Sequence, residues 1–168
     1  FSERTILRIE GLGVHFGANR VLRDINLSIE RGETVAIIGE SGCGKTVLLK
    51  MVIALLKPTE GRVFFEGQDL ATLNEKQLTA QRIRYGFLFQ QAALFDSMTV
   101  AQNVAFPLRQ HTTKSENEIR RIVLDRLAEV GLSHRIVSSK PAELSGGMRK
   151  RVGLARALVL EPVLMLYD

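Results

Sequence analysis

Gly39-Glu40-Ser41-Gly42-Cys43-Gly44-Lys45-Thr46 fits the pattern G-x-x-x-x-G-K-[ST] and decides how the rest of the chain is interpreted. The run before it, residues 33–38, is apolar and β-branched, which predicts a buried strand. The run after it, residues 47–56, is mostly apolar and predicts a helix. The glycines therefore lie at a strand-to-helix turn, where successive backbone N–H groups can point into one concave, anion-binding nest.

This nest predicts a nucleotide phosphate as its ligand. The Lys45 side chain can reach the β- and γ-phosphates, and the Thr46 hydroxyl can ligate Mg²⁺. We therefore expect ATP and Mg²⁺ as cofactors, with Lys45 as a catalytic group and Thr46 as a metal ligand. The candidate nucleotide-binding residues of this segment are Gly39, Glu40, Ser41, Gly42, Cys43, Gly44, Lys45, Thr46 and Val47. A glycine-rich turn without a ligand is the alternative, and the flanking strand and helix argue against it.

The composition of the 168 residues, 45% apolar and 24% charged, is typical of one globular domain. No apolar run approaches the about 20 residues that span a bilayer. The single cysteine, Cys43, excludes an internal disulfide and fits a reducing compartment. The net charge of +5 would suit nucleic acid, an anionic membrane surface or a nucleotide. The one dense basic patch, Arg149-Lys150-Arg151, has no interleaved aromatic residues, so we expect no nucleic-acid partner.

The rest of the chain alternates strand-like and helix-like segments. We expect strands at residues 5–9, 21–30, 62–66, 85–89 and 163–168, and helices at residues 75–84, from Thr99, from Ser115 to Gly131, and from Ser145 to about Leu160. Ser115 and Glu118 have the spacing of a capping box, and Thr99 and Ser145 are N-cap residues. The alternation predicts an α/β fold with a parallel sheet, interrupted by a helical insertion at residues 91–151.

Further motifs follow the glycine-rich turn. Leu144-Ser145-Gly146-Gly147-Met148 is a serine-capped helix start with two glycines, which can bind an anion through its free N–H groups. Taken alone it would be an ordinary capped helix, because a chain with one phosphate site needs no second one. Residues 163–168 are an apolar strand that ends in Asp168, the Walker B pattern, whose carboxylate serves Mg²⁺. Gln90 closes another strand between the two motifs.

In this order, the set of motifs resembles the ATPase domain of ABC transporters, and the likeness covers nearly the whole chain. The resemblance implies an α/β, RecA-like P-loop NTPase fold: a parallel-sheet core with an N-terminal antiparallel β subdomain and a helical subdomain insertion. It also implies that residues 1–168 are a single ATP-binding domain truncated at Walker B. The core would comprise residues 1–90 and 152–168, and the helical subdomain residues 91–151.

The resemblance also implies roles for individual residues. Phe16 would stack on adenine, although a core position in the first sheet is the alternative. Gln90 would contact Mg²⁺ or the attacking water, which makes it both a catalytic and a metal-binding candidate. Asp168 would ligate Mg²⁺. Ser145-Gly146-Gly147 would bind the γ-phosphate of the ATP that the other protomer of a homodimer holds.

The sequence departs from the family pattern at two points. Met148 stands where the signature usually ends in glutamine, so a polar contact of that side chain is lost or replaced. The family's catalytic glutamate directly follows the Walker B aspartate, and this sequence ends at Asp168. We therefore expect the full-length protein to hydrolyse ATP and these 168 residues alone to bind it with little or no hydrolysis. None of His15, His111 and His134 matches the family's switch histidine, because all three precede the Walker B strand.

A closer likeness rests on residues 89–100, residues 103–109, and Met148 followed by the basic triplet. These resemble the ATPase subunit of MCE-type phospholipid transport systems, also called toluene-tolerance or lipid-asymmetry systems. The likeness implies a homodimeric ATP-binding subunit, peripheral on the cytoplasmic side of the inner membrane, that drives phospholipid transport between membranes through a transmembrane permease. Two alternatives stay open: the ATPase subunit of a small-solute importer for amino acids or metals, and a non-transport ABC protein of translation or DNA repair.

Overall fold

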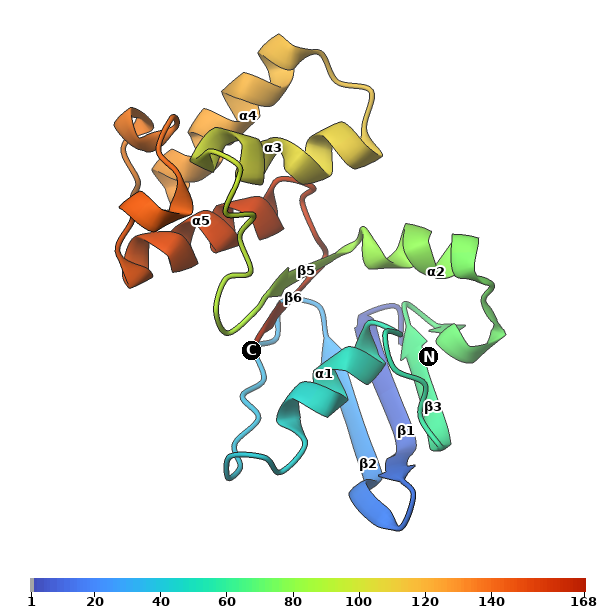
Figure 1. Cartoon of the computed structure of the whole chain (residues 1–168). Helices are drawn as coiled ribbons and strands as arrows, with labels where there is room; N and C mark the ends of the chain where they lie inside the picture. The colour runs from blue at the N-terminus through green and yellow to red at the C-terminus, as the bar shows by residue number, and fades with distance from the viewer. Residues whose placement is uncertain (1) are drawn as a thin grey trace. The chain divides into compact units, whose positions relative to one another are not determined.

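The computed structural model describes residues 2–168, which form two compact units. The first unit extends to Arg82, and the second runs from Ile83 to Asp168 (Figure 1). The boundary between the units differs from the division into a core and a helical subdomain, and that division remains a prediction.

The first unit is built on an antiparallel sheet. Its strands are β1 (Thr5–Phe16), β2 (Asn19–Glu30), β3 (Glu60–Phe65) and β4 (Gln68–Asp69), in the order β2-β1-β3-β4. β1 and β2 form a hairpin in which Phe16 pairs with Asn19 and Gly17 adopts a φ of 60° in the turn. The antiparallel β region expected at the N-terminus is therefore present.

β1 is longer than the sequence predicted. The expected strand ended at Ile9 before a glycine-containing connection, but the structure continues β1 through Gly11 to Phe16. The register between β1 and β2 shifts after Ile9, and Gly11 has a φ of 54° at that point. A bulge of this kind lets a strand absorb an extra residue and resume its pairing, so the glycine bends the strand without ending it.

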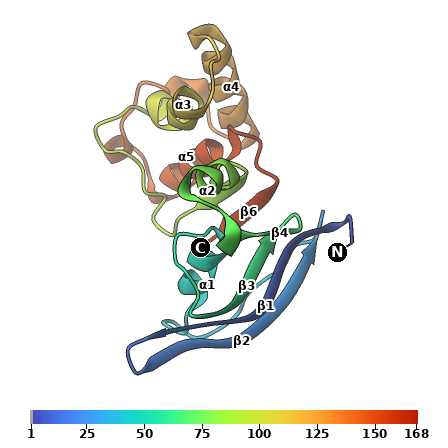
Figure 2. The ribbon, with the colours of Figure 1, turned by 90° about the vertical axis from the view of Figure 1, so that its right-hand side faces the viewer.

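Helix α1 (Lys45–Val52) lies beside one face of this sheet, as Figures 1 and 2 show. It buries Leu48, Met51 and Val52, while Phe65 of β3 is completely buried. The helix was expected to reach Leu56 but ends earlier, because Ala54 takes a left-handed backbone conformation with a φ of 56°. A left-handed residue stops the helical hydrogen-bond ladder.

The last helix of the first unit, α2, supplies hydrogen bonds to the C-terminal end of α1. A 3₁₀ turn, η1 (Leu70–Thr72), leads to helix α2 (Glu75–Arg82), whose end is two residues short of the predicted one. Arg82, the last residue of α2, donates hydrogen bonds to the carbonyl oxygens of Ile53 and Ala54 at 3.1 and 2.6 Å. The guanidinium thereby satisfies carbonyl groups that α1 leaves without intrahelical partners.

The second unit contains a pair of parallel strands, β5 (Tyr85–Leu88) and β6 (Leu164–Tyr167), near the two ends of the unit's sequence. Gly86 lies in β5 where a Cβ atom would come within 2.1 Å of the Met165 sulfur and 2.9 Å of Pro162, so a larger residue would require these neighbours to move. Helix α5 (Gly146–Leu158) packs on β5. The parallel pairing agrees with the predicted strands around residues 85–89 and 163–168.

Three helices make up the rest of the second unit: α3 (Val100–His111), α4 (Glu116–Glu129) and α5, with the 3₁₀ turns η2 (His134–Ile136) and η3 (Pro141–Glu143) between α4 and α5. Both α3 and α4 begin with complete capping boxes, at Thr99 and Ser115. Val104, Leu127 and Val152, one from each helix, are completely buried in a common core. The helices predicted from Thr99, from Ser115 and from Ser145 are confirmed.

The predicted strand at residues 33–38 is wrong. Residues 33–40 take no regular structure, and the side chains of Val35, Ile37 and Ile38 are 37, 42 and 94% exposed. Apolar β-branched residues favour an extended backbone, but a strand also needs a neighbouring strand to accept its hydrogen bonds. None of the described strands pairs with this segment, and in the part of the chain that the structure describes the parallel sheet consists of β5 and β6.

Candidate nucleotide-binding site

The glycine-rich turn leads directly into α1, which begins at Lys45. Gly44 precedes the helix with a φ of 104°, and a Cβ atom there would come within 2.9 Å of Leu22. At Gly39 a Cβ atom would come within 2.5 Å of the Cys43 sulfur. Gly44 is required by its positive φ and by the neighbouring β2 side chains, whereas a larger residue at Gly39 would have to displace the Cys43 side chain.

The Lys45 side chain folds back over this loop. Its Nζ donates to the carbonyl oxygens of Gly39 and Glu40 at 2.6 and 2.7 Å, and lies 3.6 Å from the Cys43 sulfur. The ammonium group is thereby held beside the loop, near the helix N-terminus that itself carries partial positive charge. Thr46, the second residue of α1, is exposed. A glycine cradle, an ammonium group and a hydroxyl together suit a phosphate ligand with Mg²⁺.

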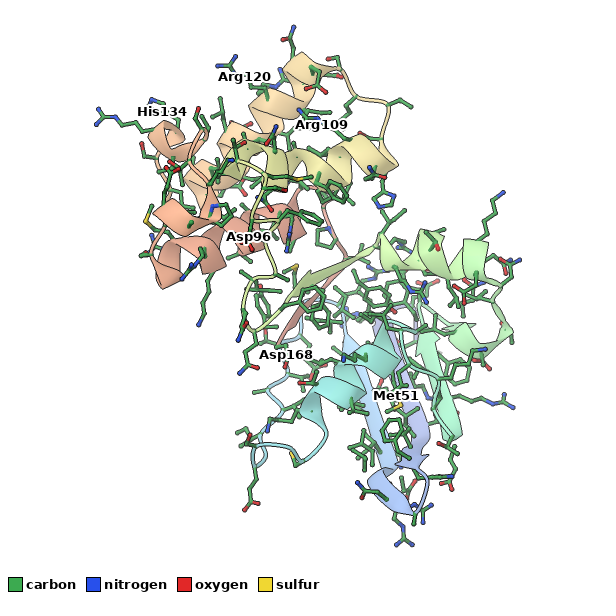
Figure 3. The ribbon with its side chains drawn as sticks, viewed as in Figure 1. Met51, Asp96, Arg109, Arg120, His134 and Asp168 are labelled. Carbon is green, nitrogen blue, oxygen red and sulfur yellow. The ribbon has the colours of Figure 1, made fainter. Side chains whose placement is uncertain are left out.

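Gln90 and Asp168 come to the same edge of one sheet. β5 and β6 are parallel, with Leu88 paired to Tyr167, and the Asp168 backbone N–H donates to the Leu88 carbonyl at 3.0 Å. Gln90 is exposed two residues beyond the end of β5, and Figure 3 shows Asp168 at the end of β6. Carboxyl edges of parallel strands are the usual place for ligand sites in α/β sheets. The structure therefore brings the two predicted Mg²⁺ ligands of the second unit together.

Helix α5 begins with an open N-terminus. Ser145 is its N-cap, and the serine Oγ accepts a hydrogen bond from the Met148 backbone N–H at 3.2 Å. Gly146 and Gly147 are exposed, and a Cβ atom at either would meet nothing within 4 Å. Met148 packs against the helical core, so this departure from glutamine replaces a polar side chain by an apolar contact.

Phe16 ends β1 and is 51% exposed. The alternative that it is a core residue of the sheet is therefore wrong. An exposed aromatic ring at a hairpin end is available for stacking on a flat ligand.

Two polar residues that the sequence analysis missed, the buried Asn103 and the half-buried Arg156, hold the loop after Gln90. Asn103 of α3 is completely buried, and its amide bonds to the Phe95 N–H and carbonyl at 2.8 and 3.1 Å, as well as to the carbonyls of Met98 and Thr99. Arg156 of α5 bonds to two carbonyls near the start of the same loop. The sequence offered a signal for Asn103, a polar residue between Val100 and Val104 on the buried face of α3, but none for Arg156.

Within residues 2–168, no helix has both the length and the apolar character that a membrane crossing requires.

Comparison with known proteins gives close matches. A family model described as ABC transporter matches residues 22–168. The probable ribonucleotide transport ATP-binding protein Mkl of Mycobacterium tuberculosis H37Rv is 48% identical over 162 residues, which are 96% of this chain and 45% of Mkl. The intermembrane phospholipid transport system ATP-binding protein MlaF of Haemophilus influenzae is 42% identical over 165 residues, 98% of this chain and 62% of MlaF. The chain therefore spans less than two thirds of the length of either relative.

A solved structure shows the same fold. The dimeric ATP-binding cassette MJ0796, in a post-hydrolysis state bound to ADP and Pi, superposes with a TM-score of 0.89 at 35% identity, covering 97% of this chain and 73% of that chain. The match confirms the predicted α/β P-loop fold class, and the relatives confirm the likeness that the motifs indicated.

Proposed function

The chain belongs to the ABC transporter family, and from that membership we propose that the full-length protein binds and hydrolyses ATP to drive transport through a partner permease. The observation that carries the proposal is that two helices of one chain, α1 and α5, begin at glycine-containing segments whose N-termini are suited to an anion.

At the first helix start, the loop from Gly39 to Val47 holds the β- and γ-phosphates of ATP through its backbone N–H groups and Lys45. Thr46, Gln90 and Asp168 hold Mg²⁺, which neutralises charge on the phosphates. Support comes from the glycine cradle around Lys45 and from the shared edge of Gln90 and Asp168. Gln90 orients the attacking water, and Phe16, exposed at the hairpin end, stacks on the adenine.

The second helix start serves the ATP of a partner copy. Gly146 and Gly147 are not required by contacts within the chain, since nothing lies within 4 Å of a Cβ atom at either position. Two small residues at an open helix N-terminus allow a phosphate from outside to approach the backbone closely. The dimeric state of the related MJ0796 cassette supports the same arrangement here. We therefore propose a homodimer in which each α5 meets the phosphates bound by the other chain.

The proposed transported molecule is a phospholipid, moved between membranes by a permease while this subunit remains peripheral on the cytoplasmic side of the inner membrane. Support comes from MlaF, which is similar over 98% of this chain, and from the segment around residues 89–109. A small-solute importer is the second candidate, which the name of Mkl favours. An ABC protein of DNA repair is disfavoured, because compact helices rather than a long coiled coil lie between Gln90 and Ser145.

Calorimetric ATP titration of the full-length protein tests the nucleotide site. Lys45→Ala should weaken ATP binding about 10- to 100-fold, because it removes a charge-assisted contact worth ~1.5–3 kcal/mol. Lys50→Ala, on an exposed position of the same helix, is the matched control and should bind ATP normally. An ATP affinity of the Lys45→Ala variant equal to that of the wild type would refute the proposed nucleotide site.

Gene deletion tests the substrate. A strain that lacks the gene should show altered outer-membrane lipid composition and lower detergent resistance. The wild-type gene should restore both properties to normal, and a gene that carries Lys45→Ala should not. Normal lipids and resistance in the deletion strain would instead favour the small-solute importer.

A further inference from the structure

The loop that follows Gln90 has a backbone that alanine rarely adopts. Ala92 and Ala93 are consecutive residues with φ values of 61 and 48°. Left-handed conformations are unfavourable for residues with a Cβ atom, and they persist where the surrounding structure holds them. Two short-range hydrogen bonds contribute, from Ala92 N–H to the Phe89 carbonyl at 2.9 Å and from Ala93 N–H to the Gln91 carbonyl at 2.8 Å. The loop therefore needs further contacts to keep this shape.

Arg156 of α5 supplies the polar contacts. Its Nη2 donates to the Ala92 carbonyl at 2.6 Å and its Nη1 to the Ala93 carbonyl at 3.0 Å. The guanidinium carbon lies 6.0 Å from the centre of the Phe95 ring. Its partners are thus two carbonyls and an aromatic ring of the same loop. Burial lowers the pKa of Arg156 from its ordinary value, but an arginine remains charged in proteins.

Gly153, about one turn before Arg156 in α5, packs closely against Ala92 and Leu88. A Cβ atom at Gly153 would come within 3.0 Å of both the Ala92 Cβ and a Leu88 methyl group. Ala92 itself is 1% exposed. Ala92 is therefore packed against α5 at Gly153, and the carbonyls of both left-handed alanines are hydrogen-bonded to α5 through Arg156.

We propose that Arg156 is a positioning residue that fixes the Gln90 loop to helix α5, so that Gln90 moves together with the helix whose N-terminus is Ser145-Gly146-Gly147. Gln90 is exposed, and its position depends on the backbone two residues further on. A movement of α5 when its N-terminus engages a phosphate would be transmitted to Gln90 through the bonds from Arg156. This inference rests on the proposed role of Gln90 in ATP hydrolysis.

Hydrogen exchange on the full-length protein tests the contact itself. Arg156→Met removes both donors but keeps an unbranched apolar stem, and it should speed amide exchange at residues 90–98 at least tenfold while exchange in α4 stays unchanged. Arg151→Met, at an exposed position of the same helix, is the matched control and should exchange like the wild type. Unchanged exchange at Ala92 and Ala93 in Arg156→Met would overturn the proposal.

Steady-state ATPase kinetics test the positioning role. Arg156→Met should lower kcat at least tenfold with KM for ATP within about twofold, because the proposed phosphate contacts come from the loop from Gly39 to Val47, and Thr46 and Asp168 remain to hold Mg²⁺. Arg156→Lys, which can still donate to one carbonyl, should recover part of kcat. If Arg156→Met fails to fold, Arg156→Lys is used for both measurements, with an intermediate effect expected in each.

Three results would separate the possible failures. Wild-type kcat in Arg156→Met, or in Arg156→Lys where that variant stands in, would overturn the positioning role. A rise in KM that accounts for the whole loss in kcat/KM would also overturn it. A wild-type protein without ATPase activity would refute the proposed function, and the exchange experiment would then still decide whether Arg156 holds the loop.

Discussion

The helix starts of α1 and α5 both contain glycines, yet the glycines are there for different reasons. At α1 the chain's own atoms exclude larger residues, since a Cβ atom at Gly44 would come within 2.9 Å of Leu22 and one at Gly39 within 2.5 Å of Cys43. At α5 a Cβ atom at Gly146 or Gly147 would meet nothing within 4 Å. The first loop is shaped by contacts within the chain. The second is left open, which suits a ligand that comes from outside it.

A further contrast concerns charge. The first turns of α1 and α5 contain no acidic residue, whereas that of α4 contains Glu116 and Glu118. Carboxylates stabilise a helix N-terminus by themselves, but they would repel a bound phosphate. α4 is therefore stabilised by its own carboxylates, whereas the N-termini of α1 and α5 carry no charge that would repel an anion. α3 also lacks acidic residues in its first turn, but the Thr99–Gln102 capping box occupies its N-terminus.

Alanine substitution in the two glycine segments should give opposite results and is the sharpest internal test of this contrast. Gly44→Ala should lower the free energy of unfolding by about 1–3 kcal/mol, because its φ of 104° is strained for alanine and the methyl group meets Leu22. Gly146→Ala should be neutral or stabilise by up to about 1 kcal/mol, because alanine fits the helix and has open space. Urea unfolding of the two full-length variants measures both changes in unfolding free energy. Equal destabilisation by Gly44→Ala and Gly146→Ala would contradict the difference between the two helix starts.

A second pair of variants compares a buried asparagine of the second unit, Asn103, with an exposed asparagine of the first unit, Asn26. Asn103→Ala should cost about 1–3 kcal/mol of unfolding free energy, because it removes the hydrogen bonds that the buried amide makes to the Phe95 N–H and the Met98 carbonyl. Asn26 of β2 is exposed, although it accepts a hydrogen bond from Gly11 N–H at 2.8 Å, and Asn26→Ala should cost less than about 0.5 kcal/mol. Thermal unfolding of both variants measures this difference: Asn103→Ala should lower the Tm more than Asn26→Ala. An equal decrease in Tm for the two variants would contradict the prediction.

The smallest expected effect concerns pH at the start of α4. Hydrogen bonds to Glu118, first from the Ser115 backbone N–H at 2.8 Å and then from the Ser115 hydroxyl, hold the pKa of this carboxyl below its usual range. Because the folded-state pKa is lowered, the carboxylate stabilises the fold above the unfolded pKa, and this contribution is lost as pH falls through the folded value. Stability measured against pH should fall slightly less on acidification in Glu118→Gln. Identical acid profiles would contradict the assignment.

Local signals predicted much of this structure. The capping-box spacing of Ser115 and Glu118 predicted the start of α4, and the N-cap residue Thr99 predicted the start of α3, because both signals lie within one turn of helix. The phosphate loop and the Ser145 cap were predicted for the same reason. The roles proposed for Gln90 and Asp168 came from the family likeness, and the parallel pairing of β5 with β6 then placed them at one edge.

The errors arose where structure depends on partners distant in the sequence. Residues 33–38 have the composition of a strand, but composition cannot supply the neighbouring strand that completes its hydrogen bonds. β1 stays paired with β2 past Gly11 through shifts in register, and this pairing cannot be recognised from the glycines of β1 alone. Arg156 contacts carbonyls more than sixty residues away, and nothing in its own helix indicates this.

The most direct test of the two helix starts is ATP-dependent dimerisation of paired variants of the full-length protein, followed by sedimentation. Gly147→Asp places a carboxylate where a partner's phosphate would bind, and it should abolish ATP-driven dimers while nucleotide binding to the monomer stays near the wild-type affinity. Lys45→Ala should weaken nucleotide binding about 10- to 100-fold and, at ATP concentrations that just saturate the wild type, should also abolish ATP-driven dimers. A mixture of the two should recover dimers, because the intact phosphate loop of one variant then faces the intact α5 of the other. Wild-type dimerisation by Gly147→Asp alone would contradict the account.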